Sequence, residues 1–190
     1  THFESQVSFL QRCIDQAPTF LRGGDCIFSF DRKSIGTWDS FLGNMEFSFA
    51  RNLLLMNMRI RNIQDFRFLD LSCGPGYGII AAHSLYPKID ITAIDFAGSF
   101  NSLVHDKLSD CDNGAIRLIS NEIWNGFGDR LPFADSSFDA VFFTCSDPYI
   151  PPHLREQVYA DIYRIIKEGG CLGILTRSYP DAECTYVKKH

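Results

Sequence analysis

The stretch that decides the fold is residues 68–78, which read Phe68-Leu69-Asp70-Leu71-Ser72-Cys73-Gly74-Pro75-Gly76-Tyr77-Gly78. A short apolar strand ends in an acidic residue and is followed by a glycine-rich turn that opens a helix. Glycines let the backbone adopt conformations that a Cβ forbids and approach a ligand closely. The N-terminus of the following helix directs free N–H groups and a positive dipole end at that ligand. This order of parts predicts a nucleotide-binding turn.

The spacing of the glycines and the position of the acid distinguish two kinds of nucleotide site. A dinucleotide site needs G-x-G-x-x-G and no acid that would repel the pyrophosphate. Here the pattern is Gly74-x-Gly76-x-Gly78, and Ile79 stands where the last glycine of the dinucleotide pattern would fall. Asp70 lies at the mouth of the turn. A carboxylate at this place favours a ligand that carries a positive charge.

Beyond this stretch, strand and helix patterns alternate from residue 66 onward. We expect strands at 66–72, 89–94, 115–120, 139–145 and 171–176, with helices at 77–86, 99–109 and 152–167. Pro151-Pro152 are expected to open the last helix, and Gly169-Gly170 to close it in a left-handed cap. The alternation predicts an α/β, doubly wound and mostly parallel sheet with helices on both faces.

Two helical pieces are expected before the first strand. Residues 3–17 place apolar side chains at helical spacing, and this helix is expected to end before Pro18. After a loop, a second helical region is expected at 39–63, broken or bent near Gly43-Asn44. The predicted organisation is therefore an N-terminal helical extension at residues 1–65 and a core domain at 66–190.

Composition limits the class of protein. A chain of 190 residues is long enough for one α/β domain with a full core. Its net charge of -5 gives no basic footprint, which argues against nucleic acid as a partner. Seven scattered cysteines without a C-x-x-C pair predict reduced thiols in a cytosolic or nuclear setting, with the cytoplasm as the expected location, and no metal site. No apolar run reaches the length of a membrane span.

Four arginines lie close together before and at the first strand: Arg51, Arg59, Arg61 and Arg67. We interpret this run as the solvated side of a helix. A contact with nucleic acid is the alternative interpretation.

Asp95 ends the second predicted strand and is followed by Phe96. In doubly wound folds an acid at this place lies beside the glycine turn and accepts hydrogen bonds from the ribose hydroxyls of a nucleotide. The alternative is an N-cap of the next helix, which aspartate favours. The turn at Gly74 upstream favours ribose binding. Phe96 is placed either to lie against an adenine ring or to fill the core.

Residues 66–177 together resemble the class I, seven-stranded S-adenosylmethionine-dependent methyltransferases, and in particular their methyltransferase-domain type 11-like members. The resemblance rests on the Gly74 turn, on Leu131-Pro132-Phe133 leading into Phe138-Asp139, and on the helix ending Lys167-Glu168-Gly169-Gly170. It implies a Rossmann-like sheet and S-adenosylmethionine as the cofactor, with Asp70 facing the methionine end. The antiparallel hairpin that closes the family's sheet is expected to be absent or truncated here, because few residues follow the fifth strand.

The resemblance also implies which residues contact the cofactor. An acid shortly before Leu131 is expected to accept a hydrogen bond from the adenine amino group. Phe127 stands at the commonest position for it, so we expect Asp129 to take this role, with Asn125 as the alternative. The family usually has glycine where Ser72 stands. The full set of expected cofactor-binding residues is Asp70, Ser72, Gly74, Gly76, Asp95, Phe96, Asp129, Arg130 and Thr144.

The acceptor is expected near the end of the fourth strand, where such folds place substrate chemistry. Asp147-Pro148-Tyr149 resembles, without its second proline, the Asp-Pro-Pro-Tyr signature of methyltransferases that act on planar amino nitrogens. We expect Asp147 to be the catalytic residue that orients or deprotonates the acceptor. An Asp-Pro turn is the alternative. Trp38 is a candidate lid residue of the N-terminal helices, and a core or interface aromatic is its alternative role.

The implied reaction is transfer of a methyl group from S-adenosylmethionine to a nucleophilic nitrogen or oxygen, with a small molecule as the expected acceptor. Because the cofactor supplies the activated group, the protein mainly has to position and desolvate the acceptor. Two alternatives stay open at this point. One is a non-catalytic S-adenosylmethionine-binding or interaction module, and the other is an enzyme that methylates protein or RNA.

Overall fold

A parallel sheet forms the centre of the structure, a computed structural model that describes residues 4–24, 34–96, 98–109, 116–119 and 122–176. Its strands are β1 (Arg67–Leu71), β2 (Asp90–Ile94), β3 (Ile116–Ile119), β4 (Phe138–Thr144) and β5 (Ile166–Leu175). Their order in the sheet is β3-β2-β1-β4-β5, and every pair of neighbours is parallel. The winding reverses between β3 and β4, so β1 and β4 flank the switch point where doubly wound folds bind ligands. The predicted α/β, doubly wound sheet is confirmed.

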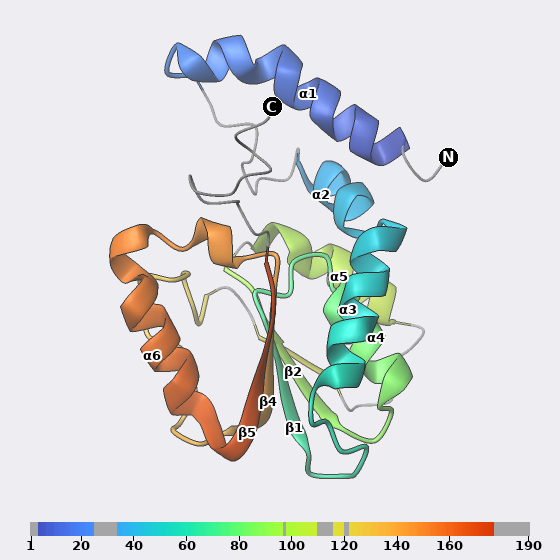
Figure 1. Ribbon diagram of the computed structural model, residues 1–190, viewed down its shortest axis with the longest axis vertical. Helices are drawn as coiled ribbons and strands as arrows, with labels where there is room; N and C mark the ends of the chain where they lie inside the picture. Colours follow the sequence, from blue (N-terminus) through green and yellow to red (C-terminus); the bar gives the residue numbers. More distant parts are fainter. Residues whose placement is uncertain (1–3, 25–33, 97, 110–115, 120–121, 177–190) are drawn as a thin grey trace, which may run out of the picture.

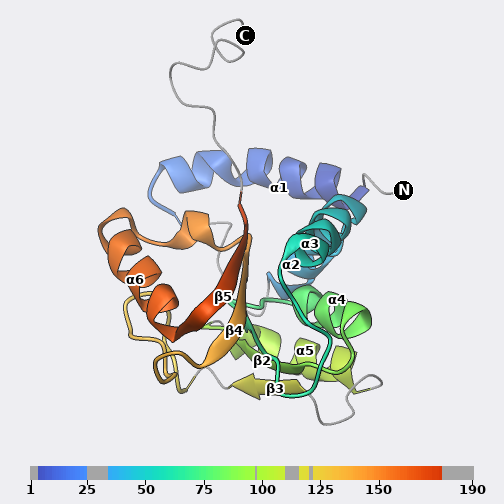
Figure 2. The ribbon, with the colours of Figure 1, turned by 60° about the horizontal axis from the view of Figure 1, so that its bottom comes forward.

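Helices cover both faces of this sheet (Figure 1). On one face lie α3 (Met45–Asn57), α4 (Tyr77–Leu85) and α5 (Asn101–Leu108), and on the other lies α6 (Arg155–Ile165). The helices α1 (Glu4–Leu21) and α2 (Ile35–Leu42) lie beyond the carboxyl ends of the strands (Figure 2). Short 3₁₀ helices are η1 (Gly98–Phe100), η2 (Asp147–Tyr149) and η3 (Pro152–Leu154). Within the described residues, no helix has both the length and the apolarity to cross a membrane.

The core has two parts, one on each face of the sheet. In β1 the side chains alternate, so that Phe68 joins the cluster that contains Leu55 and Ile79, while Leu69 and Leu71 join the cluster of α6. Phe9, Trp38 and Phe41 of the N-terminal helices belong to the first cluster. The helices α1 and α2 therefore share a core with the sheet, and this packing holds α2 over the carboxyl edge of the sheet.

The N-terminal helices differ in their bounds from the sequence prediction. α1 continues through Pro18 to Leu21, because a proline in a helix removes only one backbone donor and the turns on both sides can persist. α2 begins at Ile35 instead of residue 39, and α3 ends at Asn57 instead of residue 63. The predicted break at Gly43-Asn44 is confirmed.

The end of the last helix also corrects the prediction. α6 ends at Ile165 and β5 begins at Ile166, so Gly169-Gly170 lie inside a strand and do not form a helix cap. The pairing of β5 with β4 is irregular between Phe138 and Ala140. Gly169 has a φ of +76°, which suits the extra residues of such an irregularity. The predicted absence of a closing hairpin falls on residues 177–190, which lie outside the described residues.

Candidate functional site

A cavity of about 290 Å³ opens at the carboxyl edge of the sheet. The turn after β1, the ends of β2 and β4, and the helices α2 and α3 all contribute to its lining. Five of the residues predicted to bind the cofactor line it: Ser72, Gly74, Asp95, Phe96 and Thr144. The topology therefore brings residues from three different strand ends into one cavity.

The glycine turn is fixed by Asp95. The Gly74 N–H donates a hydrogen bond of 2.7 Å to Oδ2 of Asp95, whose side chain is buried at the cavity wall. Gly76 has a φ of +83° and is the N-cap of α4, so the helix begins directly beyond the turn. Ser72 also has a positive φ, of 60°, which explains why glycine suits this position. The N-cap of α5 is Phe100, and Asp95 does not occupy that position.

Asp70 lies just behind the cavity wall. It is fully buried at the end of β1 and accepts a backbone hydrogen bond from Ile79, while its Oδ2 has no hydrogen-bond partner among the described residues. Burial raises the pKa of Asp70 to about 8, against the opposing effect of the Arg51 charge. Gly78 lines the cavity, and a Cβ atom at this position would overlap the Asp70 carboxylate. The glycine is therefore required for Asp70 to lie beside the helix start.

Arg51 is a site residue that the sequence interpretation missed. Its side chain lines the cavity and is only 4% exposed, so the solvated-face interpretation is wrong for Arg51. Arg59, Arg61 and Arg67 are exposed as expected but do not lie on a helix, because α3 ends at Asn57 and Arg67 belongs to β1. Burial lowers the pKa of the Arg51 guanidinium, and Nε has no hydrogen-bond partner within the described part of the chain. The missed signal is its spacing, because Phe47, Arg51 and Leu55 follow at four-residue intervals on one face of α3.

Tyr77 fastens the N-terminal helices to the glycine turn. The Arg51 guanidinium lies 5.1 Å from its ring centroid, and the Lys107 ammonium lies 3.8 Å from it. Lys107 also forms an ion pair with Asp39 of α2 and donates to the carbonyl of Pro75 at 3.2 Å. Burial raises the pKa of Tyr77 to about 12. These contacts close the cavity from the side of α2 and α3.

Aromatic side chains form the end of the cavity beneath α2. Trp38 is 5% exposed and meets the ring of Tyr149 edge-on at a centroid distance of 6.2 Å. Phe41 and Phe47 line the same end and form a T-shaped pair at 5.1 Å. Trp38 thus contacts the core through Phe9 and Phe41 and also lines the cavity. Its position therefore fits both the candidate lid residue and the core aromatic that was its alternative role.

Asp147 does not line the cavity with the aromatic residues and the glycine turn. Its carboxylate accepts hydrogen bonds from Arg155 (3.2 Å) and from the Tyr159 hydroxyl, both on α6. Pro148 and Tyr149 line the cavity, but Asp147 does not. Its predicted catalytic role remains a prediction, and its position in η2 is that of the turn former that was the alternative.

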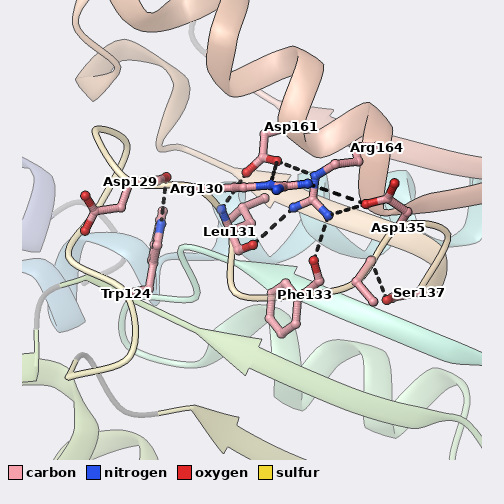
Figure 3. Close-up of polar contacts among 10 residues, drawn as sticks. Trp124, Asp129, Arg130, Leu131, Phe133, Asp135, Ser137, Asp161 and Arg164 are labelled. Carbon is pink, nitrogen blue, oxygen red and sulfur yellow. Dashed lines mark hydrogen bonds and ion pairs between the residues drawn. The ribbon is translucent and has the colours of Figure 1, made fainter.

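Asp129 and Arg130 also lie away from the cavity. They line a separate hollow of about 320 Å³ between α6 and the loop that carries Trp124 and Phe127. The carbonyl of Asp129 accepts a hydrogen bond from Trp124 Nε1 at 3.4 Å, and Figure 3 shows its carboxylate directed away from the neighbouring polar groups. The Arg130 side chain is 70% exposed and faces Asp161. Asp129, the predicted adenine contact, and Arg130 therefore do not line the cavity, and neither does the alternative Asn125.

Arg164 holds this loop to α6 (Figure 3). Its guanidinium donates to the carbonyls of Leu131 (3.1 Å) and Phe133 (2.7 Å) and to the carboxylates of Asp135 (2.8 Å) and Asp161 (2.6 Å). The rings of Trp124 and Phe127 at the start of the loop contact Phe96 at centroid distances of 6.0 and 5.7 Å. The loop therefore supports the Phe96 side of the cavity from behind.

A family described as methyltransferase domain matches residues 68–170, which is more than half of the chain. The chain belongs to this family. The membership confirms the class predicted from the Gly74 turn, the class I methyltransferases whose cofactor is S-adenosylmethionine. No group of three or more His, Cys, Asp or Glu side chains arranged to hold a metal ion occurs in the described ranges.

Individual proteins resemble this chain in sequence or in fold. The chain is 30% identical over 114 residues to a demethylmenaquinone methyltransferase from Listeria monocytogenes serotype 4a (strain HCC23), covering 60% of this chain and 45% of that protein. A crystal structure of a SAM-dependent methyltransferase from Aquifex aeolicus superposes with a TM-score of 0.60 at 17% identity, covering 80% and 77% of the two chains. The [4+2]-cyclase SpnF superposes with a TM-score of 0.58 at 20% identity, covering 69% and 45%. The chain thus spans about half the length of the curated relatives it matches.

Proposed function

We propose that this chain binds S-adenosylmethionine in the cavity at the carboxyl edge of the sheet and transfers its methyl group to a nitrogen or oxygen of a small molecule. The observation that carries the proposal is the meeting of Asp95, the Gly74 turn and the buried Arg51 in one cavity. Asp95 matches the ribose diol of the cofactor, and Arg51 matches its charged amino-acid end. The Gly74 turn allows the close backbone approach that the nucleoside needs.

Each residue has a role that follows from its chemistry. Asp95 is suited to accept hydrogen bonds from the ribose hydroxyls, and Phe96 offers an aromatic surface to the adenine. Arg51 is suited to pair with the carboxylate of the amino-acid end, since its buried Nε otherwise lacks a partner among the described residues. Asp70, when ionised, favours the positive charges of the same ligand from behind the wall.

When bound, S-adenosylmethionine supplies a sulfonium-activated methyl group, whose carbon bonds to the acceptor while sulfur keeps the electron pair and the acceptor proton passes to solvent. The protein's contribution is to hold the acceptor beside the end of β4 and to exclude water. Thr144 and Ser146 provide hydroxyls at this place, and Trp38 and Tyr149 cover it. Placement and desolvation of this kind do not require an ionised base in the cavity.

A second function is favoured by one observation. The carboxylate of Asp147, the predicted base, is occupied by Arg155 and Tyr159, and the carboxylate found in the described lining of the cavity is that of Asp95, which the proposal assigns to the ribose. Transfer to an acceptor that must first be deprotonated would need such a base, whereas a binding module that holds the cofactor without transferring the methyl group would not. The similarity of the fold to a [4+2]-cyclase is consistent with this alternative, since one fold serves several reactions.

The test is a transfer assay with tritium-labelled methyl groups. The chain is incubated with labelled S-adenosylmethionine and with fractions of small phenols, small amines, protein and RNA, and Asp95→Ala serves as the control. The proposal expects label in a small-molecule fraction and none with the control. Label in protein or RNA would instead favour a macromolecular acceptor, and cofactor binding without any transfer would favour the binding module.

A further inference from the structure

The aromatic end of the cavity differs in chemistry from the rest of it. Four aromatic side chains, Trp38, Phe41, Phe47 and Tyr149, line this end from α2, α3 and η2. Trp38 and Tyr149 approach edge to face, with an angle of 85° between their ring planes. The two residues come from distant parts of the chain, because Tyr149 follows β4 while Trp38 lies in the N-terminal helix α2.

The charged side chains of the cavity leave no free partner for a charged acceptor at this end. Arg51 and Asp95 are the charged residues among its described lining, and the proposed function assigns both of them to the cofactor. A cationic acceptor would meet the positive charge of Arg51 one helical turn from Phe47, and an anionic one would compete with the cofactor for that guanidinium. This argues for an acceptor that is uncharged where it meets Trp38.

The geometry of the rings favours a planar acceptor over an aliphatic one. Aromatic side chains bind other aromatic rings in offset-stacked or edge-to-face arrangements with centroids 4.5–7 Å apart. The rings at this end already meet one another at 5.1 Å and 6.2 Å in such arrangements. Trp38 is 5% exposed and Tyr149 is 38% exposed, so one side of the pair is fixed in the core while the other lies at the mouth.

We propose that the acceptor is an uncharged planar aromatic compound whose ring packs against the pair that Trp38 and Tyr149 form. This inference rests on the proposed function only for the division of the cavity into a cofactor part and an acceptor part. The nucleophilic atom of such a compound would be directed toward Thr144 and Ser146 at the end of β4, where the aromatic end meets the polar part.

The test compares naphthol with its saturated, non-planar counterpart decalol, by calorimetric titration of the chain saturated with S-adenosylhomocysteine. We expect naphthol to bind at least ~10-fold more tightly than decalol, because ring contacts exceed simple burial of the same area. Tyr149→Leu, which changes a half-exposed residue at the cavity mouth, should remove most of this preference, and Trp38→Leu should do the same. Phe49→Leu, an exposed residue of α3 outside the cavity, is the matched control and should keep the preference.

Equal binding of the two probes to the unmodified chain would overturn the inference, as would a preference for naphthol that persists in both leucine variants. Failure of the proposed function has a different signature, because it is read from S-adenosylhomocysteine itself. If that compound does not bind, the cofactor assignment fails. The comparison of naphthol with decalol, repeated in the chain without S-adenosylhomocysteine, then still decides whether the aromatic end selects planar rings.

Discussion

The Gly74 N–H and the Asp95 carboxylate, 21 residues apart in the sequence, are joined by a hydrogen bond of 2.7 Å at the carboxyl edge of the sheet. This bond connects the turn after β1 to the end of β2, and both residues line the cavity. A single carboxylate thus shapes the turn and lines the cavity. Its removal should affect both tasks.

Asp95→Ala should weaken S-adenosylhomocysteine binding by ~100-fold, because hydrogen bonds to a charged group and the support of the turn are lost together. Asp95→Asn should cost less, since the amide oxygen can still accept from Gly74. Calorimetric titration measures both variants. Asp106→Ala, an exposed acid of α5, is the control and should bind like the unmodified chain. Equal affinities for all three variants would contradict the role of Asp95.

Arg51→Gln should weaken S-adenosylhomocysteine binding by ~10- to 100-fold, the range expected for a charged hydrogen bond to a carboxylate. It should leave binding of methylthioadenosine unchanged, because that nucleoside lacks the amino-acid end. Arg59→Gln removes an exposed arginine two residues beyond α3 and should change neither affinity. If Arg51→Gln weakens both ligands equally, Arg51 supports the cavity without contacting the carboxylate.

Asp70 should make the stability of the ligand-free chain depend on pH. Burial raises the pKa of Asp70 to about 8 from its ordinary value of 3.8, so the folded state holds a proton that the unfolded chain has lost. The free energy of unfolding should therefore fall as the pH rises from about 4 to about 8. Asp70→Asn should flatten this slope in urea unfolding experiments, and Asp90→Asn, an exposed acid at the start of β2, should not. An unchanged slope in Asp70→Asn would show that Asp70 is ionised in the folded chain.

Gly78→Ala should destabilise the fold by ~1–3 kcal/mol, because its Cβ would overlap the Asp70 carboxylate. Gly36→Ala in α2 is the matched control, since a Cβ there meets no atom within 4 Å and alanine favours a helix. A double variant with Asp70→Ala should recover part of the loss, which thermal or urea unfolding can measure as a coupling energy. Additive effects would place the strain at another contact.

Arg164→Lys should destabilise the fold by ~1–3 kcal/mol, because lysine cannot bond the carbonyls of Leu131 and Phe133 and the carboxylate of Asp161 at once. Trp124 is 1% exposed, so loosening its loop should shift its fluorescence to longer wavelength. The emission is recorded in a Trp38→Phe background, in which Trp124 is the one tryptophan that remains. Arg130→Lys, whose side chain is exposed, should change neither property. A fluorescence spectrum unaffected by Arg164→Lys would mean that the loop is held by its apolar contacts.

The sheet and the glycine turn could be predicted because their signals are local. The apolar run before Asp70 and the glycines after it define a strand, a turn and a helix within a short stretch, and the alternation that follows fixes the topology. Gly169-Gly170 were misplaced because their prediction also relied on a local signal. Two glycines after a helical pattern read locally as a cap, whereas the pairing of β5 with β4 extends the strand back to Ile166.

The site could be predicted only where the backbone determines the direction of a side chain. Ser72, Gly74 and Asp95 are fixed by strand ends and reach the cavity as expected. Asp147 and Asp129 stand at suitable places in the sequence, but Arg155 and Tyr159 of α6 hold the Asp147 carboxylate, and Asp129 lies on a loop that lines the separate hollow beside α6. Arg51 was missed because the burial of an arginine depends on contacts that form only when α3 packs over the turn.

The central claim is that one cavity holds S-adenosylmethionine between Asp95 and Arg51, and calorimetric titration of the chain with that compound tests it most directly. The account predicts saturable binding of one molecule per chain that is weakened by Asp95→Ala and by Arg51→Gln but not by Asp106→Ala. Absence of binding to the unmodified chain, or binding that none of these substitutions alters, would contradict it.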